Sequence, residues 1–165
     1  MEKLIGILRF ALAREVEGRE FYKEKSQKVK SKDVKDTFES LYQMEEEHVK
    51  FIANLMEKLQ KDVEINIDAE LVKTDFFDNR EKTELMPGTL EDMANDLSIL
   101  RMAYLIEEDF ENFYKMSAEK VENEEMKKLL NTLAKWEEGH KKALLELYEE
   151  TMKTYWDKQG FTPLF

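Results

Sequence analysis

The chain has 165 residues, a mass of 19.7 kDa and a formal net charge of −11 at pH 7. It contains no cysteine, which excludes disulfides, thiolate metal sites and thiol catalysis. The negative charge argues against binding to nucleic acid or to an anionic membrane, and no segment is apolar for long enough to span a bilayer. We expect a cytoplasmic, single-domain protein whose available metal ligands are Asp, Glu and His.

Residues 1–61 predict a helical hairpin. Apolar residues recur at three- and four-residue spacing from Leu4 to Val29, and again from Val34 to Leu59. The turn between these stretches is short and offers Ser31 and Asp33 as helix N-caps. Two helices, each of about 27 residues, must therefore lie antiparallel.

Residues 62–88 show no sustained period. A loop of this length is uncommon in a compact domain, but helical bundles use such a segment as a crossover that places two consecutive helices parallel. We expect Phe76 and Phe77 to anchor this crossover on the core. A flexible linker between two separate hairpins is the alternative.

Residues 89–154 predict a second hairpin, followed by a C-terminal tail at 155–165. Thr89 is a helix cap with Asp92 three residues later, and the helix that it starts runs to about Val121. A fourth helix then ends near Thr154. The fold class predicted is therefore all-α, a four-helix bundle of two antiparallel hairpins joined by a long crossover.

The second hairpin repeats the first at an offset of 92 residues without a gap. Both of the histidines in the chain belong to this repeat, and each follows a glutamate by three positions. The pairs that the offset aligns include Glu15 with Glu107, Tyr22 with Tyr114, Glu45 with Glu137, and His48 with His140.

The aligned acids and histidines predict a metal centre. On a helix, Glu45 and His48 project from one face, and the antiparallel hairpin brings Glu15 level with them. The second hairpin does the same with its own copies, so all six side chains can meet in one layer. With both imidazoles neutral, four carboxylates carry −4, which two divalent ions would neutralise; these donors suit iron or manganese better than zinc or copper. The alternative is a duplicated structural helix that keeps these residues solvated on its outside.

These residues resemble the ferritin-like superfamily, and most closely the di-iron domain of the rubrerythrin family. The similarity covers residues 4 to about 153 and rests on "AREVEGREFY" with "MEEEHVKF" and "IEEDFENFY" with "WEEGHKKA". The resemblance implies two iron ions, with manganese as an alternative metal. It also implies that Glu45 and Glu137 bridge the ions, that Glu15 and Glu107 are terminal ligands, and that His48 and His140 each bind one ion. Tyr22 and Tyr114 could donate hydrogen bonds to these ligands or be ordinary core residues.

The resemblance implies an oxidoreductase of peroxidase or ferroxidase type, which reacts with oxygen or hydrogen peroxide in oxidative-stress defence. Peroxide-reducing relatives carry a further glutamate one turn after the third-helix ligand, where this chain has Phe110, with Gly18 as its repeat partner. Glu108 and Glu111 do not fall in that register. The cysteines of a rubredoxin module are also missing, so we expect electrons to come from a separate donor such as a rubredoxin-like protein.

Three other functions remain open from the sequence: iron binding or handling without redox turnover, a manganese catalase-like enzyme, and a hydroxylase-like di-metal enzyme. The apolar tail, with Tyr155, Trp156, Phe161, Leu164 and Phe165, could seal a dimer or cap its own bundle. We expect a homodimer, because two-fold dimers are the commonest symmetric assemblies.

Overall fold

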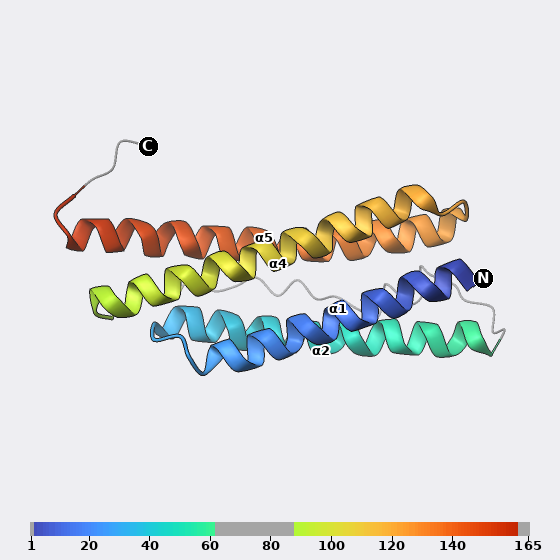
Figure 1. Cartoon of the computed structure of the whole chain (residues 1–165), viewed down its shortest axis with the longest axis horizontal. Helices are drawn as coiled ribbons and strands as arrows, with labels where there is room; N and C mark the ends of the chain where they lie inside the picture. Colours follow the sequence, from blue (N-terminus) through green and yellow to red (C-terminus); the bar gives the residue numbers. More distant parts are fainter. Residues whose placement is uncertain (1, 62–87, 162–165) are drawn as a thin grey trace.

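The computed structural model describes residues 2–61 and 88–161. In these ranges the chain forms four α-helices and no strand (Figure 1). The prediction of an all-α, ferritin-like four-helix bundle is confirmed. None of the helices in the two ranges has a stretch long and apolar enough to cross a membrane. The helices are α1 (Glu2–Ser26), α2 (Lys32–Gln60), α4 (Leu90–Lys120) and α5 (Glu124–Lys158).

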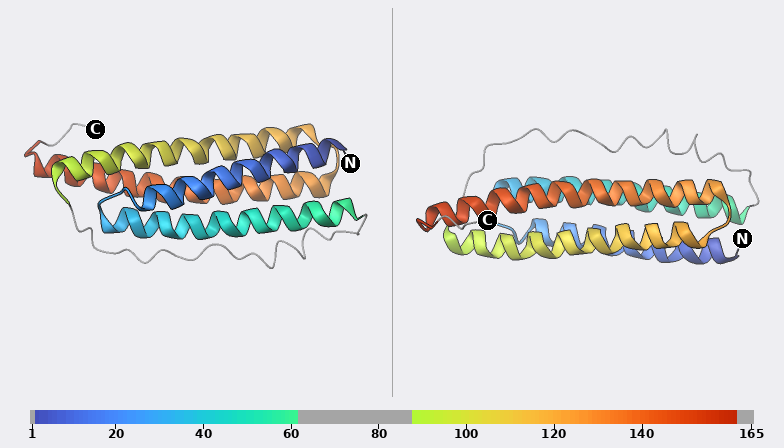
Figure 2. Two further views of the ribbon diagram at one scale, coloured as in Figure 1. Left: turned by 60° about the horizontal axis from the view of Figure 1, so that its bottom comes forward. Right: turned by 90° about the horizontal axis from the view of Figure 1, so that it is seen from above.

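The four helices form two antiparallel hairpins, α1 with α2 and α4 with α5. Helix α2 ends at one end of the bundle and α4 begins at the other, so these two helices run parallel, as expected for hairpins joined by a crossover (Figure 1). The connecting residues 62–87, which include Phe76 and Phe77, lie outside the described residues. Seen from above, α1 and α4 lie in one layer, and α2 and α5 lie in the other (Figure 2, right). Contacts between α1 and α4 join the two hairpins.

The helix starts follow two different rules. Thr89 and Asp92 form the predicted capping box, in which each side chain accepts a hydrogen bond from the other residue's backbone N–H. Ser31 occupies the N-cap position of α2, as predicted, but its side chain makes no capping hydrogen bond. The backbone N–H groups of Lys30 and Ser31 instead donate to the carboxylate of Asp96 on α4, at 3.0 Å and 2.7 Å.

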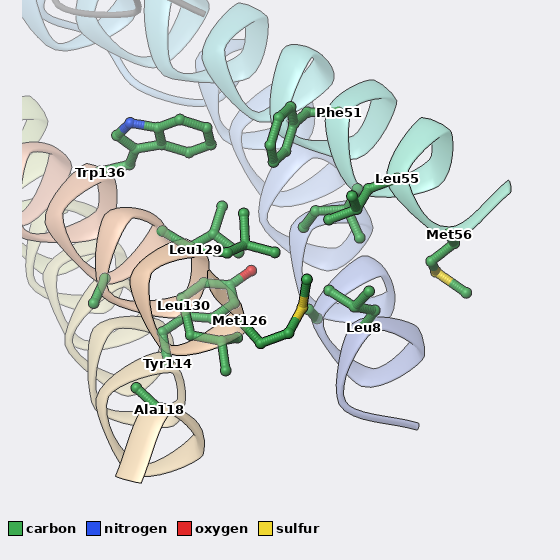
Figure 3. Packing of buried hydrophobic residues seen from close by; sticks show 14 residues of the cluster. Leu8, Phe51, Leu55, Met56, Tyr114, Ala118, Met126, Leu129, Leu130 and Trp136 are labelled. Carbon is green, nitrogen blue, oxygen red and sulfur yellow. The ribbon is translucent and has the colours of Figure 1, made fainter. Parts of the chain in front are cut away.

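The apolar core is divided into two clusters along the bundle axis. One cluster gathers where α1 begins and α2 ends, and it includes Leu8, Phe51, Leu55, Leu129 and Leu130 (Figure 3). The other lies toward the opposite end and includes Val34, Phe38, Leu100, Leu144 and Leu147. The residues between them along each helix are the polar ones singled out by the repeat, so a polar layer crosses the middle of the bundle.

The last helix is longer than expected. Helix α5 continues to Lys158 and so includes Tyr155 and Trp156. The ring of Trp156 meets Tyr155 and Phe161 edge-on, with centroid distances of 5.2 Å and 5.5 Å. These aromatic residues therefore pack on one another within the chain, whereas Leu164 and Phe165 lie outside the described residues.

Candidate metal centre

All six residues that the repeat singles out as metal ligands lie inside the bundle. Glu15 on α1, Glu107 on α4, and Glu45 and His48 on α2 are fully buried, as is Glu137 on α5, and His140 is 5% exposed. Burial of four carboxylates in one layer carries a large desolvation cost unless they are paired or bind an ion. The alternative of a solvated outer face is therefore wrong for every one of these residues.

His48 faces three of the carboxylates. Its Nδ1 donates a hydrogen bond to Oε2 of Glu15 at 3.1 Å. The same nitrogen lies 3.2 Å from Oε2 of Glu45 and 3.6 Å from Oε1 of Glu137. The spacing of three residues between Glu45 and His48 brings both side chains to the same face of α2.

His140 repeats this arrangement in the second hairpin. Its Nδ1 lies 3.5 Å from Oε2 of Glu107, 3.4 Å from Oε2 of Glu137 and 3.1 Å from Oε1 of Glu45. Glu45 and Glu137 thus present one oxygen to each histidine, whereas Glu15 and Glu107 each face only one. The residues that the 92-residue repeat aligns are therefore related in space by an approximate two-fold axis through the layer.

Several atoms of the layer lie within ion-pair distance of one another but make no hydrogen bond of normal geometry with the residues that the structure describes. They are both carboxylate oxygens of Glu45 and of Glu137, Oε2 of Glu107 and Nδ1 of His140. Buried polar atoms are almost always satisfied, so a converging set of unsatisfied oxygen and nitrogen atoms fits a bound cation. The potential ligand atoms of Glu45, His48, Glu137 and His140 all lie within 4.8 Å of one another.

The charges of the layer differ from the simple count of −4. Burial lowers the pKa of His48, but the charge of Glu45 and the hydrogen bond to Glu15 outweigh burial and raise that pKa to about 10. Burial and the charge of Glu45 raise the pKa of Glu15 to about 7, and burial also raises the pKa of Glu137. Without metal, protons on the imidazoles and on some carboxylates therefore take the place of cations.

The two tyrosines contact the ligands of the opposite hairpin. The hydroxyl of Tyr22 on α1 donates to Oε1 of Glu107 on α4, and the hydroxyl of Tyr114 on α4 donates to Oε1 of Glu15 on α1. Both rings are fully buried. Burial is the main cause that raises the pKa of each hydroxyl well above its ordinary value, so both tyrosines keep the proton that they donate.

Phe110 and its repeat partner Gly18 meet in the interface between α1 and α4. Phe110 is 2% exposed, and its ring packs against the position that a Cβ atom on Gly18 would occupy. Glu111 is not free to replace a glutamate there, because Lys115 and Lys141 both form ion pairs with its carboxylate. At this position the chain therefore places an apolar ring beside the layer, and not a further carboxylate.

Sequence reasoning did not identify the aromatic ring that covers His48. The indole of Trp136 on α5 stacks on this imidazole with a centroid distance of 4.7 Å and an interplanar angle of 17°. His48 in turn stacks on His140 at 5.2 Å and 11°. The sequence does place Trp136 directly before Glu137 in "WEEGH". The equivalent position in the first hairpin is Met44, so the repeat did not single out this tryptophan.

Comparison with known proteins agrees with this arrangement. The sequence model of the rubrerythrin family matches residues 6–148, a range that contains all six buried ligand candidates. No curated protein matches the chain. Among solved structures, a hypothetical protein from Pyrococcus furiosus is similar at 28% sequence identity and a TM-score of 0.66, with 90% of each chain covered.

Proposed function

The chain belongs to the rubrerythrin family, and on that premise we propose that it is a di-iron carboxylate protein that reacts with oxygen or hydrogen peroxide. The observation that supports this proposal most directly is the convergence of buried carboxylate oxygens and imidazole nitrogens within 4.8 Å of one another. Oxygen and nitrogen donors without sulfur suit iron, and they also suit manganese.

The approximate two-fold arrangement supports two ions per chain. Glu15 and His48 would hold one ion, and Glu107 and His140 the other. Glu45 and Glu137 would bridge the pair, because each directs one oxygen toward either histidine. When bound, iron would supply electrons and Lewis acidity to the oxidant.

The residues of this chain would bind the ions, exclude water and position protons. Complete burial of Glu45 and Glu137 keeps bulk water from competing with an oxidant for the layer. Tyr22 and Tyr114 orient the outer carboxylates and hold a phenolic proton near each of them. Because the chain has no cysteine, the electrons would come from a separate donor, such as a rubredoxin-like protein.

A second function, iron binding or handling without redox turnover, is favoured by one observation. The place where peroxide-reducing relatives have a further glutamate holds the buried ring of Phe110, and the neighbouring Glu111 is neutralised by two lysines. Neither of these two positions therefore offers an additional carboxylate that could follow a change in the charge of the ions.

The test is anaerobic reconstitution with ferrous iron, followed by metal analysis and visible spectra before and after addition of peroxide. A di-iron protein binds two irons per chain and then oxidises faster than free ferrous iron in stopped-flow mixing. Glu45→Gln should bind less iron, whereas Glu47→Gln, a matched change at a half-exposed neighbour, should bind as the wild type does. Two bound irons that stay inert to both oxidants would support iron handling, and failure to bind iron or manganese would reject both functions.

A homodimer remains part of the proposal. Phe161 follows α5 and exposes 57% of its surface, so the C-terminal aromatic residues offer an apolar surface to a second copy. Sedimentation velocity of the wild type and of Phe161→Ser tests this directly, since a dimer sealed by this residue should dissociate in the variant.

A further inference from the structure

We propose that Phe110 closes the metal layer on the side of α1 and α4, and that small molecules reach the layer between these helices when its ring moves aside. This inference rests on the proposed function, because an access route matters only if the layer holds metal. It assigns a role to the residue that departs from the pattern of the peroxide-reducing relatives.

The Phe110 ring and the Glu45 carboxylate converge over the backbone of Gly18. A Cβ atom placed on Gly18 would lie 3.1 Å from Cε2 of Phe110 and 3.7 Å from the carboxyl carbon of Glu45. Gly18 itself is buried and has no side chain that could fill this space. The ring is therefore the group that occupies the space above Gly18 beside the Glu45 carboxylate.

A cation lies on the outer side of the ring. The guanidinium carbon of Arg14 is 5.9 Å from the centroid of Phe110 and 5.0 Å from that of Phe10. The Arg14 side chain is 40% exposed and forms an ion pair with Glu17 at 3.2 Å, so it lies at the surface where the route would begin. From solvent inward, the order is a guanidinium, a single aromatic ring and the Glu45 carboxylate.

The repeat shows why one ring is enough. Gly18 and Phe110 are equivalent positions, so they face each other across the two-fold axis near the middle of the layer. Phenylalanine at both positions would overlap, because even a methyl group on Gly18 makes a close contact of 3.1 Å. Glycine at both would leave the layer without cover on this side.

The opposite side of the layer is closed in a different way. There Trp136 stacks on His48, so displacing the indole would disturb a ligand candidate. The phenyl ring of Phe110 makes no hydrogen bond, and its movement breaks van der Waals contacts and the contact of its face with the Arg14 guanidinium. The α1/α4 side is therefore the one that can open without disturbing the ligands.

Cobalt(II)-loaded protein allows a test that does not depend on turnover, because binding of azide to the metal changes its visible absorption. Azide is small enough to pass between the helices once the Phe110 ring has moved. We expect Phe110→Ala to bind azide at least about tenfold faster than the wild type, and Phe110→Leu, which keeps most of the volume, to stay within about threefold. Trp136→Ala, a truncation on the opposite side, should not accelerate azide binding comparably.

Equal azide rates in the wild type and Phe110→Ala would overturn the inference, as would equal acceleration by Phe110→Ala and Trp136→Ala. Should the alanine variant not fold, Phe110→Val provides a smaller truncation with the same expected direction. Cobalt stoichiometry is measured first for each protein. A wild type that binds neither cobalt nor iron contradicts the proposed function and this inference with it, whereas normal loading with unchanged azide rates rejects the inference alone.

Discussion

The hydroxyl of Tyr22 donates a hydrogen bond to Glu107, a residue of the opposite hairpin. Tyr114 does the same for Glu15, so each half of the chain supplies a proton donor to the outer carboxylate of the other. The carboxylates are thereby oriented from a helix that does not carry them, and their position depends on how α1 packs against α4.

Replacing either tyrosine by phenylalanine should therefore weaken the fold and metal binding together. Tyr22→Phe and Tyr114→Phe keep the ring but leave a buried carboxylate oxygen without its donor, at a cost of about 1–3 kcal/mol in the free energy of unfolding. Metal affinity should fall about 10- to 100-fold, as for other residues that orient ligands. Urea unfolding and metal titration measure the two effects, and Tyr104→Phe, a partly buried tyrosine on α4, is the control. Unchanged affinity in both variants would show that the hydroxyls do not orient the ligands.

Removal of metal should lower the melting temperature at neutral pH. An ion that binds the folded chain and not the unfolded one adds its binding free energy to stability. The difference between loaded and chelator-treated protein should become smaller toward about pH 5, because protons then compete for the ligands. Calorimetry of both forms at the two pH values checks this, and coincident melting curves at pH 7 would argue against a buried ion.

The metal-free protein should lose stability as the pH rises. The pKa of Glu15 is raised from 4.5 to about 7, and that of His48 from 6.5 to about 10. A raised pKa means that the folded state binds the proton more tightly, so this stabilisation is complete below the unfolded pKa and is lost as the pH passes the folded one. The two histidines lower the pKa of Glu45 against the effect of burial, so Glu45 contributes stability that is present at neutral pH and is lost only as the pH falls below 4.5.

Urea unfolding of chelated protein at about pH 6 and pH 9 measures this loss, which spans the window between the pKa values given above. The loaded protein should show less of it, because metal binding requires deprotonated ligands and is favoured at higher pH. Metal-free protein that is more stable at pH 9 than at pH 6 would contradict the charge arrangement of the layer.

Gly18→Ala should destabilise the wild type and be better tolerated when Phe110 is smaller. The new methyl group would lie 3.1 Å from the phenyl ring, and overpacking of this kind costs about 1–3 kcal/mol. In a Phe110→Ala background the clash is absent, so the double-mutant cycle should show a favourable coupling between the two changes. Additive effects in the cycle would mean that the ring and Gly18 are not in contact in solution.

Asp96→Ala should destabilise the fold by about 1–3 kcal/mol, because the buried N–H of Ser31 and the partly buried N–H of Lys30 lose their acceptor. Asp96→Asn keeps an acceptor oxygen and should cost less. Asp109→Ala, at an exposed aspartate of the same helix, is the control and should stay near wild-type stability in the same unfolding experiment.

The helices and the ligand layer were predictable because both depend on spacing along the chain. The apolar period of α2 and the three-residue step from Glu45 to His48 place side chains on faces without knowledge of the tertiary structure. The repeat then related the hairpins, and the structure brings all six predicted ligand residues into one layer.

The contacts between hairpins were not predictable in the same way. The tyrosines had been recognised as candidates, but their crossed pairing depends on how far α1 slides along α4, which no spacing within a hairpin determines. Asp96 is one of 37 acidic residues, and its partners are backbone amides that leave no mark in the sequence. The protonated state of the histidines depends on distances to carboxylates, so counting charges could not reveal it.

The hydrogen bonds from Lys30 and Ser31 to Asp96 also bear on the order of events during synthesis. When α1 and α2 leave the ribosome, the turn between them still lacks Asp96, which accepts hydrogen bonds from its backbone N–H groups. The carboxylate of Glu15 likewise still lacks the hydroxyl of Tyr114. The amino-terminal hairpin thus depends on the second hairpin for these hydrogen-bond partners. Its turn and its metal layer therefore become complete only when the second half of the chain has folded against it.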